Sequence, residues 1–537
     1  MKTLRQSMSW MHTWTGLLFG WVLYFMFVTG SVGYYDTEID RWMQPERPAP
    51  VEVIDTAALF QTALDHAYTE APTADRYFVL LPTTRSYSPY IRMSWNGTDV
   101  NGKRTSGSAE LLADGSIASK GRETGGGQAL YRMHWTFHYI PRQLGEFIAG
   151  VAAFFMLAAI VSGIITHKKI FIDFFTLRLA KGQRSWLDAH NVVSVMTLPY
   201  QIMITYSGIL FVGTLFFAPI IAAQYGVGKE ARATMIQEIY GLQEQSERTG
   251  VSAPMVPLDS LVAEAQRIFP DEPITRMSVA NPGDETAKIV VMGTLTGGIQ
   301  RSIPKVHFNG VTGELIRIEP RQIKDGVSIV DVFEGLHEAL FAGPILRILF
   351  FVSGLLGAAM IATGLVLWTK KRRQKLKSND SAERNLVIIE RMNVGMIAGL
   401  PIAIAAYFSA NRLLPLGIQG RGEWEIHTLF LVWGLAIGHS VLRPPRNGWT
   451  EQLTVAAIAF VSVPVLNAAT TSIHLGQTLP LPGRSGDFAL AGVDLWLLLT
   501  GMAFGYAALV ASKKAAIMPS NELRPVVSSA VEAQPAE

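Results

Sequence analysis

The residues of this sequence best suited to chemistry are histidines. The chain has 11 histidines and no cysteine. Disulfides, thiolate iron–sulfur clusters, haem attachment through C-x-x-C-H and cysteine nucleophiles are therefore excluded together. Any metal or haem iron must be held by histidine, methionine, tyrosine or carboxylate side chains.

Two of the histidines begin apolar stretches that repeat one another. His12 lies 17 residues before Thr29-Gly30, and His190 lies 17 residues before Ser207-Gly208. Equal separations in two copies of one pattern indicate an internal duplication, in which equivalent residues take equivalent places.

A second pair of equivalent histidines begins the other apolar stretches of the repeat. His134 and His337 each lie seven residues before a proline. If a pseudo-twofold axis relates the two copies, each histidine faces its own equivalent, which is the arrangement that two axial ligands of one haem iron require. The pattern predicts two b-type haems, one held by His12 and His190 and the other by His134 and His337.

Two further histidines leave the ligand set open. His138 lies one helical turn after His134, and His167 ends the second apolar stretch near the expected level of His12 and His190. Either could replace a ligand, orient one through a hydrogen bond, or serve a third site. The alternative is that helix-end histidines are interfacial residues, as Trp and Tyr often are. The histidines to which we assign no chemistry are His66, His307, His427, His439 and His474.

The elements that must position these histidines are membrane spans. Hydrophobic residues make up 49% and charged residues 17% of the 537 residues, a composition typical of membrane proteins. A span takes about 20 apolar residues. Eight such stretches are expected, at 13–35, 144–166, 191–220, 345–368, 390–410, 426–442, 452–470 and 488–511.

Clusters of lysine and arginine predict the orientation of the spans. They follow every second span, and the positive-inside rule then places both termini on the cytoplasmic side of a bacterial inner membrane. Because the basic residues stand in short runs beside apolar segments, we expect a lipid partner and no nucleic acid. The residues are Lys168, Lys169, Arg178, Lys181, Arg184, Lys370, Lys371, Arg372, Arg373, Lys375, Lys377, Arg443, Arg446, Lys513 and Lys514.

Two long polar inserts are expected on the periplasmic side. The first predicts a helix near 56–68 and strands near 77–81 and 90–95. The second predicts a helix from Leu258 and strands at 289–292 and 305–308. Each insert therefore indicates a small α+β module, and the Gly125–Gly127 run after the first is expected to be a linker.

The predicted fold is mainly α. It is a polytopic membrane protein with a duplicated four-helix haem-binding bundle, two periplasmic α+β modules and four additional C-terminal transmembrane helices. The expected divisions are TM1 at 1–35, module 1 at 36–133, TM2–TM3 with a cytoplasmic loop at 134–220, module 2 at 221–336, TM4 with its basic end at 337–377, TM5–TM8 at 378–515 and a disordered tail at 516–537.

Several motifs of the sequence resemble the PepSY-associated transmembrane family. The likeness covers essentially the whole chain, and two features depart from it: Gln201 stands where relatives often have histidine, and the helices after Lys377 are absent from shorter members. The matching motifs are Met11–Gly16 with Thr29-Gly30, Ser162–Phe171, Trp186–Asn191, Thr312–Leu315 and Asn411–Pro415.

The resemblance implies a function in iron uptake. The ferric-siderophore (ferrioxamine) reductase type of this family is a haem-containing inner-membrane protein, so the likeness implies reduction of siderophore-bound Fe(III) in the periplasm. Hard oxygen ligands hold Fe(III) better than Fe(II), so reduction releases the iron. The family's histidine positions are occupied by His12, His134, His190 and His337, while His138 and His167 fall in motif blocks.

The sequence also bears on the electron donor and on the surface that the iron chelate approaches. No G-x-G-x-x-G or Walker A motif is present, so we expect a quinol or a separate reductase as electron donor. The approach surface for the chelate could be supplied by Arg85, Tyr87, Tyr90, Arg92 and Trp95. The alternatives are a haem-free scaffold whose PepSY modules regulate periplasmic peptidases, and a transporter of iron or siderophore.

Overall fold

The computed structural model describes most of the chain. The described residues are 3–47, 55–83, 85, 89–98, 103–167, 172, 174, 178, 182–216, 218–228, 230–231, 233–235, 247–321, 325–375, 381–482 and 486–517. Residues singled out above that lie outside this description are Lys168, Lys169, Ile170, Phe171, Lys181 and Lys377, Tyr87 of the expected approach surface, and the expected tail from Met518 onward.

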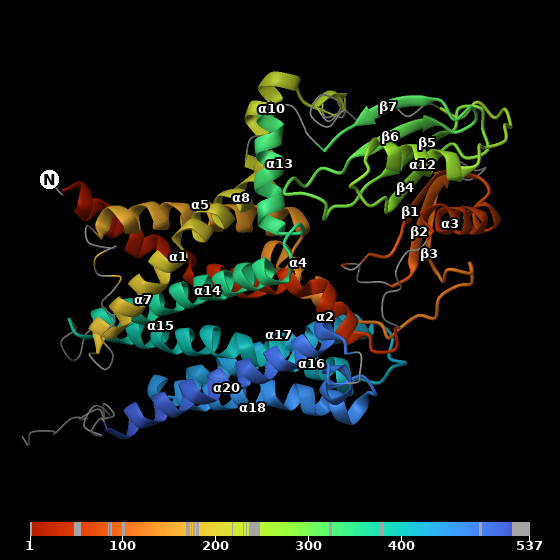
Figure 1. Ribbon diagram of the computed structural model, residues 1–537. Coiled ribbons are helices and arrows are strands. Elements are labelled where there is room, and N and C mark those ends of the chain that lie inside the picture. The colour runs from red at the N-terminus through yellow and green to blue at the C-terminus, as the bar shows by residue number, and fades with distance from the viewer. Residues whose placement is uncertain are drawn as a thin grey trace, which may run out of the picture.

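Long helices run side by side and form most of the structure (Figure 1). The chain is a multi-pass membrane protein, because among the described residues seven helical segments are long and apolar enough to cross a bilayer. They are Leu4–Met43, Arg142–Thr166, Pro344–Arg373, Ala382–Leu413, Arg421–Leu442, Pro445–Thr470 and Phe488–Lys514.

The third expected span differs from a straight helix. It consists of α7 (Gln183–Met196) and α8 (Leu198–Phe211), which meet at an angle of 68°. Pro199 lies in the first turn of α8. Proline has no N–H to donate and its ring clashes with the carbonyl four residues earlier, so the α7 helix cannot continue through it. The expected total of eight spans holds if this bent pair is counted as one.

The first four spans and their inserts form two copies of one unit. The first copy contains α1 (Leu4–Val32), α2 (Asp36–Met43), α3 (Thr56–Glu70), α4 (Gly126–Thr136) and α5 (Arg142–Thr166). The second copy contains α7, α8, α9 (Gly213–Phe216), α10 (Ala218–Tyr225), α12 (Leu258–Ile268), α13 (Asp325–Glu338) and α14 (Pro344–Arg373).

The two inserts share a single antiparallel sheet. Its strand order is β3-β2-β1-β4-β5-β6-β7, so the inserts join edge to edge where β1 pairs with β4 and Phe78 lies opposite Ser278. The strands are β1 (Ala74–Leu80), β2 (Ile91–Thr98), β3 (Arg104–Leu111), β4 (Arg276–Ala280), β5 (Lys288–Met292), β6 (Lys305–Asn309) and β7 (Leu315–Glu319).

One face of this sheet is covered by α3 and α12. Alternate strand residues such as Tyr77, Val79 and Met277 point toward these helices and are fully buried, as the two-residue period of a strand requires. The opposite, helix-free face carries the intervening residues. The expected strands near 77–81, 90–95, 289–292 and 305–308 are all present, whereas pairing between the inserts was not expected.

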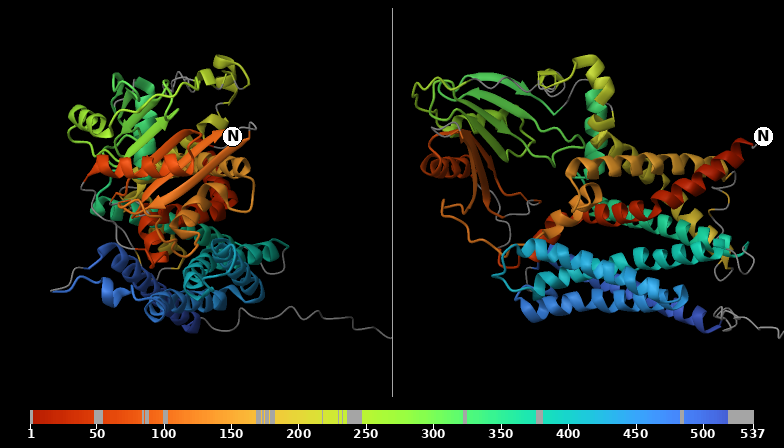
Figure 2. Two further views of the ribbon diagram at one scale, coloured as in Figure 1. Left: turned by 90° about the vertical axis from the view of Figure 1, so that its right-hand side faces the viewer. Right: turned by 180° about the vertical axis from the view of Figure 1, so that it is seen from behind.

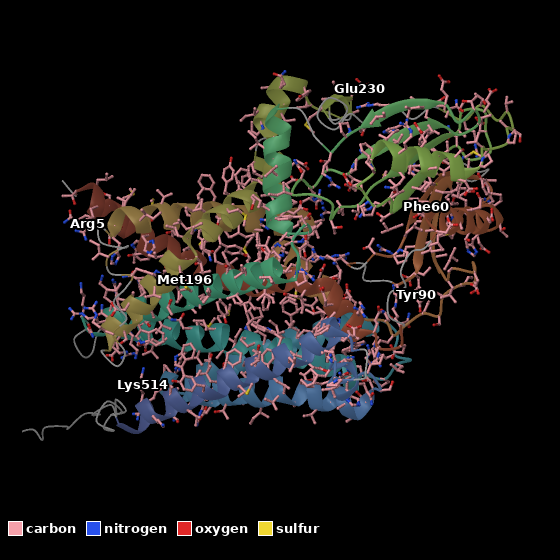
Figure 3. All side chains as sticks on the ribbon, viewed as in Figure 1. Arg5, Phe60, Tyr90, Met196, Glu230 and Lys514 are labelled. Atoms are coloured by element: carbon pink, nitrogen blue, oxygen red, sulfur yellow. The ribbon has the colours of Figure 1, made fainter. Side chains whose placement is uncertain are left out.

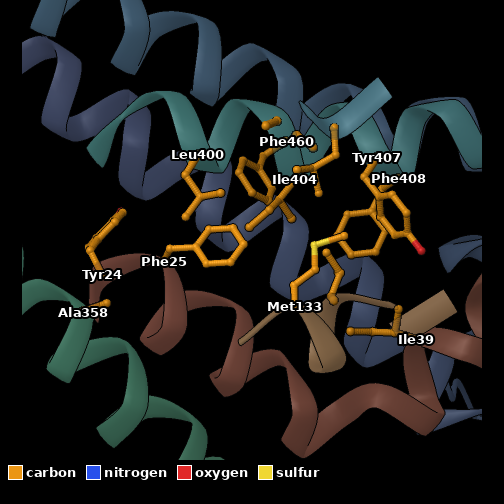
Figure 4. Packing of buried hydrophobic residues seen from close by; sticks show 14 of the residues in the cluster. Tyr24, Phe25, Ile39, Met133, Ala358, Leu400, Ile404, Tyr407, Phe408 and Phe460 are labelled. Atoms are coloured by element: carbon orange, nitrogen blue, oxygen red, sulfur yellow. The ribbon is translucent and has the colours of Figure 1, made fainter. Parts of the chain in front are cut away.

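The remaining helices pack against α1 and break the twofold symmetry. They are α15 (Ser381–Ile397), α16 (Gly399–Leu413), α17 (Arg421–Leu442), α18 (Pro445–Thr470), α19 (Leu475–Thr478) and α20 (Phe488–Ile517). Phe25 lies against Leu400 and Ile404 in the shared apolar core (Figure 4). The Trp21 indole also donates to Asn393 at 2.8 Å.

The two ends of the bundle differ. The sheet lies beyond one end, and the N-terminus lies at the other (Figure 2). Arg5 and Lys514 both lie at the end far from the sheet, whereas Phe60 and Tyr90 lie on the sheet side (Figure 3). We call these the N-terminal end and the sheet end.

Candidate functional site

The first histidine pair lies at the N-terminal end of the bundle. His12 comes from α1 and His190 from α7, and their ring centroids are 6.3 Å apart. A capping box between Thr3 and Gln6 starts α1. The start of α7 is held by Asp188, whose buried carboxylate accepts three hydrogen bonds from Arg178. These local contacts fix the two helices that present the rings.

The second pair lies at the sheet end. His134 from α4 and His337 from α13 have ring centroids 6.5 Å apart and an interplanar angle of 22°. The glycine run before His134 is not a linker but the start of α4: Gly126 has a φ of +64°, and a Cβ at Gly127 would lie 2.3 Å from the Asp36 carbonyl oxygen. Only glycine permits this approach of α4 to α2.

Each of the four rings has its Nδ1 atom engaged in a hydrogen bond. Nδ1 of His12 lies 2.8 Å from the Ala159 carbonyl oxygen, and Nδ1 of His190 lies 2.9 Å from that of Met360. Nδ1 of His134 bonds the Tyr131 carbonyl oxygen.

The fourth acceptor is a side chain. Nδ1 of His337 lies 2.8 Å from Ser207 Oγ, and that hydroxyl donates its own proton to the Met203 carbonyl oxygen at 2.7 Å. With the hydroxyl donating there, its oxygen is left to accept from Nδ1 of His337, which would then carry the proton while Nε2 keeps its lone pair. Within the described residues no group hydrogen-bonds Nε2 of any of the four histidines.

Each of the four repeated Ser-Gly or Thr-Gly dipeptides places its glycine against a histidine ring. A Cβ added at any of the four glycines would lie 3.1–3.3 Å from a histidine ring, which is tighter than ordinary contact. The facing pairs are Gly163 with His12, Gly364 with His190, Gly30 with His134 and Gly208 with His337. The duplicated motif thus serves to seat each ring against a neighbouring helix.

The separation of the rings suits a metal ion between them. If both Nε2 atoms pointed at one metal ion about 2 Å away, the length of a zinc–histidine bond, and each nitrogen lay about 1.1 Å from its ring centroid, the centroids would be about 6.2 Å apart. The measured separations are 6.3 Å and 6.5 Å. A carbonyl or hydroxyl on the opposite nitrogen is the usual partner of a metal-bound imidazole, so the residues fit bis-histidine haem.

The two pairs lie far apart along the bundle. His12 and Gly30, which contacts the His134 ring, are 18 residues apart on α1. At 1.5 Å per residue this is about 27 Å, close to the thickness of the hydrocarbon region. This spacing fits the prediction of one pair near each membrane face.

His138 lies apart from both pairs, whereas His167 lies close enough to His12 and His190 to interact with both electrostatically. His138 follows α4 and contacts Glu423 of α17, with its Nε2 3.1 Å from the carboxylate. His167 ends α5, where its backbone N–H donates to the Gly163 carbonyl oxygen at 3.1 Å. Gln201 is buried at the interface of α8 and α14 and contacts Ser353.

Two aromatic residues next to the sheet-end pair were missed from the sequence. The Tyr131 ring lies 5.2 Å from that of His134, and the Phe211 ring lies 5.2 Å from that of His337. Burial raises the pKa of Tyr131 to about 12, so its hydroxyl stays protonated. Phe211 follows Ser207 by one helical turn, a spacing that could have identified it.

Comparison with known proteins gives one match. The family model described as the PepSY-associated TM region matches residues 9–371, which is more than half of the chain and includes all four paired histidines. The resemblance to the family is thereby confirmed for residues 9–371, whereas the Asn411–Pro415 motif lies outside the match and the reductase type stays a prediction. No curated protein matches the chain.

Proposed function

Because the chain belongs to the family of PepSY-associated transmembrane proteins, we propose that it is a ferric-siderophore reductase of the bacterial inner membrane. In this proposal it holds two b-type haems and moves electrons across the membrane to Fe(III) bound by a siderophore in the periplasm. The Fe(II) produced is held weakly by hard oxygen ligands and is released.

One observation carries this proposal. Two pairs of histidines from different helices face each other at 6.3 Å and 6.5 Å, and every Nδ1 is already hydrogen-bonded. Histidines that served only as interfacial residues would have no reason to meet in pairs across the two copies of a repeat, each with Nε2 free of hydrogen bonds within the described residues.

The residues of the chain have defined tasks in this scheme. His12 and His190 would hold one haem, and His134 and His337 the other, while the glycines facing them keep the rings in place. Haem bound in this way supplies reversible one-electron chemistry. The apolar helices around the pairs exclude water, so electrons rather than solutes cross the bundle.

The basic residues indicate how the protein is oriented in the membrane. Arg5 and Lys514 lie at the N-terminal end (Figure 3), which the positive-inside rule assigns to the cytoplasm. The sheet end is then periplasmic. Electrons from a quinol or a separate reductase would pass by way of the His12–His190 pair to the His134–His337 pair, where the acceptor is reduced.

The first test is an optical spectrum of the detergent-purified protein, oxidised and dithionite-reduced, with a pyridine haemochrome assay for stoichiometry. We expect about two haem b per chain and reoxidation of the reduced protein by a ferric siderophore. A haem-free protein after expression with ample haem would refute the proposal and favour the scaffold alternative.

A further inference from the structure

A row of arginines crosses the helix-free face of the sheet. Arg92 on β2 and Arg276 on β4 lie on either side of Leu80, which pairs with both. Their strand neighbours Met93 and Met277 point to the opposite face and are buried under α3 and α12. Both guanidinium groups therefore emerge on the helix-free face, separated by one strand.

This part of the sheet faces the sheet-end histidine pair. The loop before β6 approaches α13 so closely that a Cβ at Gly335 would lie 1.8 Å from the Ile299 carbonyl oxygen. The loop places the Arg301 guanidinium 5.6 Å above the Phe211 ring, and that ring contacts His337. Figure 1 shows the sheet beyond this end of the bundle, with α3 on the side away from the helices.

Two carboxylates offset the charge of Arg301, whereas Arg276 has no such partner among the described residues. Arg301 is paired with Glu338 at 2.9 Å and lies 3.9 Å from Glu334. Glu110, which lies opposite Arg92 on β3, is paired with Arg47 at 3.0 Å. Positive charge therefore remains at Arg276.

Arg276 is the unusual member of the cluster. Its Nε is buried, and within the described part of the chain the side chain makes no hydrogen bond or ion pair. Burial, followed by the charges of Arg92 and Arg301, lowers the pKa of Arg276. A half-buried guanidinium facing two others is costly unless an anion occupies the site.

We propose that this surface, defined by Arg92, Arg276 and Arg301, binds small anionic ferric chelates of the polycarboxylate type. This inference rests on the function proposed above and specifies its substrate class. The one electron needed would be supplied by the haem that His134 and His337 would hold, on the side of Phe211. One Fe(III) becomes one Fe(II) within the chelate, and no proton or covalent bond changes hands.

The proposal separates chelates by charge. An anionic complex such as ferric citrate is attracted to the arginines, whereas a cationic hydroxamate complex such as ferrioxamine B is repelled. The chain would thus differ in substrate preference from the reductase type that its motifs resemble.

The test uses gallium citrate, a redox-inert anionic analogue, with binding to the full-length detergent-purified protein followed by calorimetry. Arg276→Gln should weaken binding about tenfold or more, because it removes a charge-assisted contact. Arg76→Gln is the matched control. Arg76 lies on β1 on the same face as Leu80, four residues and about 13 Å along the strand from it, so its loss should change the dissociation constant less than about twofold.

The outcomes distinguish this inference from the proposed function. Binding needs no haem, so an Arg276-dependent affinity in a haem-free protein would leave the site standing and remove the reductase. Unchanged binding in Arg276→Gln, or equal weakening in Arg76→Gln, would overturn the site. If Arg276→Gln does not fold, the unmodified protein decides: affinity for gallium citrate must fall with added salt, and a salt-independent affinity would also overturn the site.

Discussion

The hydroxyl of Ser207 offers a sharp test of how the sheet-end pair is oriented. Within the described structure it is the side chain nearest to any of the four Nδ1 atoms, at 2.8 Å from that of His337, whereas Thr363 Oγ1 lies 3.4 Å from Nδ1 of His190. Ser207→Ala removes the hydroxyl partner of that buried N–H and leaves the backbone of Ile204 as the other one, so the cost is at most about 1–3 kcal/mol. Loss of such a partner typically weakens metal binding about 10–100-fold.

The same change should alter the reduction potential of one haem. The hydrogen bond increases electron donation from the imidazole, which favours Fe(III). If losing this hydrogen bond destabilises the Fe(III) form by about 0.5–1.4 kcal/mol more than the Fe(II) form, the midpoint potential rises by about 20–60 mV for a one-electron couple. Potentiometric titration followed optically should show one component moving upward and the other staying in place.

The repeat supplies a matched control at the equivalent position. Thr29 takes the place of Ser207 in the first copy, but its hydroxyl donates to the Phe25 carbonyl oxygen at 2.7 Å and does not bond His134, which uses Tyr131 instead. Thr29→Ala should therefore leave both potentials unchanged. Equal shifts in the two variants, or no shift in Ser207→Ala, would contradict the assigned role of the hydroxyl.

The remaining predictions concern ligation, packing and pH. His337→Ala should remove the sheet-end haem signal and reduction of an external ferric chelate, while His12→Ala should remove the other haem signal. His138→Ala should remove neither signal; optical spectra check all three variants, and loss of either signal in His138→Ala would contradict the pairing. Gly364→Val should lower occupancy of the N-terminal haem, because its Cβ lies 3.1 Å from the facing ring, and a full haemochrome yield would count against this packing. Hydrogen bonds from Thr286 and the neighbouring backbone hold the pKa of Asp284 well below its usual range. The ionised carboxylate therefore stabilises the fold above about pH 4, and this stabilisation is lost as pH falls toward the native pKa. Hydrogen exchange in residues 247–286 should rise at low pH, and Asp284→Asn should show that faster exchange already at pH 7.

Much of the architecture could be predicted because periodicity and composition are local. The spans and the strand near 77–81 follow from apolar runs and alternation within a few residues. The pairing of β1 with β4 could not be predicted, since it joins edges 200 residues apart that have no distinctive sequence. Pro199 marks a place where a helix can break, but proline is tolerated often enough in membrane helices that the bend there could not be predicted from the sequence.

The site divides in the same way. Repeat spacing selected His12 with His190 and His134 with His337, and the structure brings each pair together, while iron ligation stays a prediction. The spacing could not reveal the acceptors of the Nδ1 protons, because three of the four are backbone carbonyls of Ala159, Met360 and Tyr131 and a carbonyl has no signature in sequence. Arg276 was missed for a related reason: only the sheet register shows that it lies beside Arg92.

The edge where β1 meets β4 has a consequence for how such a molecule can be built. Arg76 pairs with Ala280 and Leu80 with Arg276 around a centre at Phe78 and Ser278, so equivalent strands meet in an isologous contact, as in a C2 dimer. Half of the duplicated region, expressed alone, carries one member of each histidine pair and one copy of this edge. Two such halves could complete both pairs by self-association, and fusion in one chain makes that assembly independent of concentration. Fusion also lets the two copies differ in sequence, so that additional helices can pack on one side of the bundle, as α15 to α20 do here.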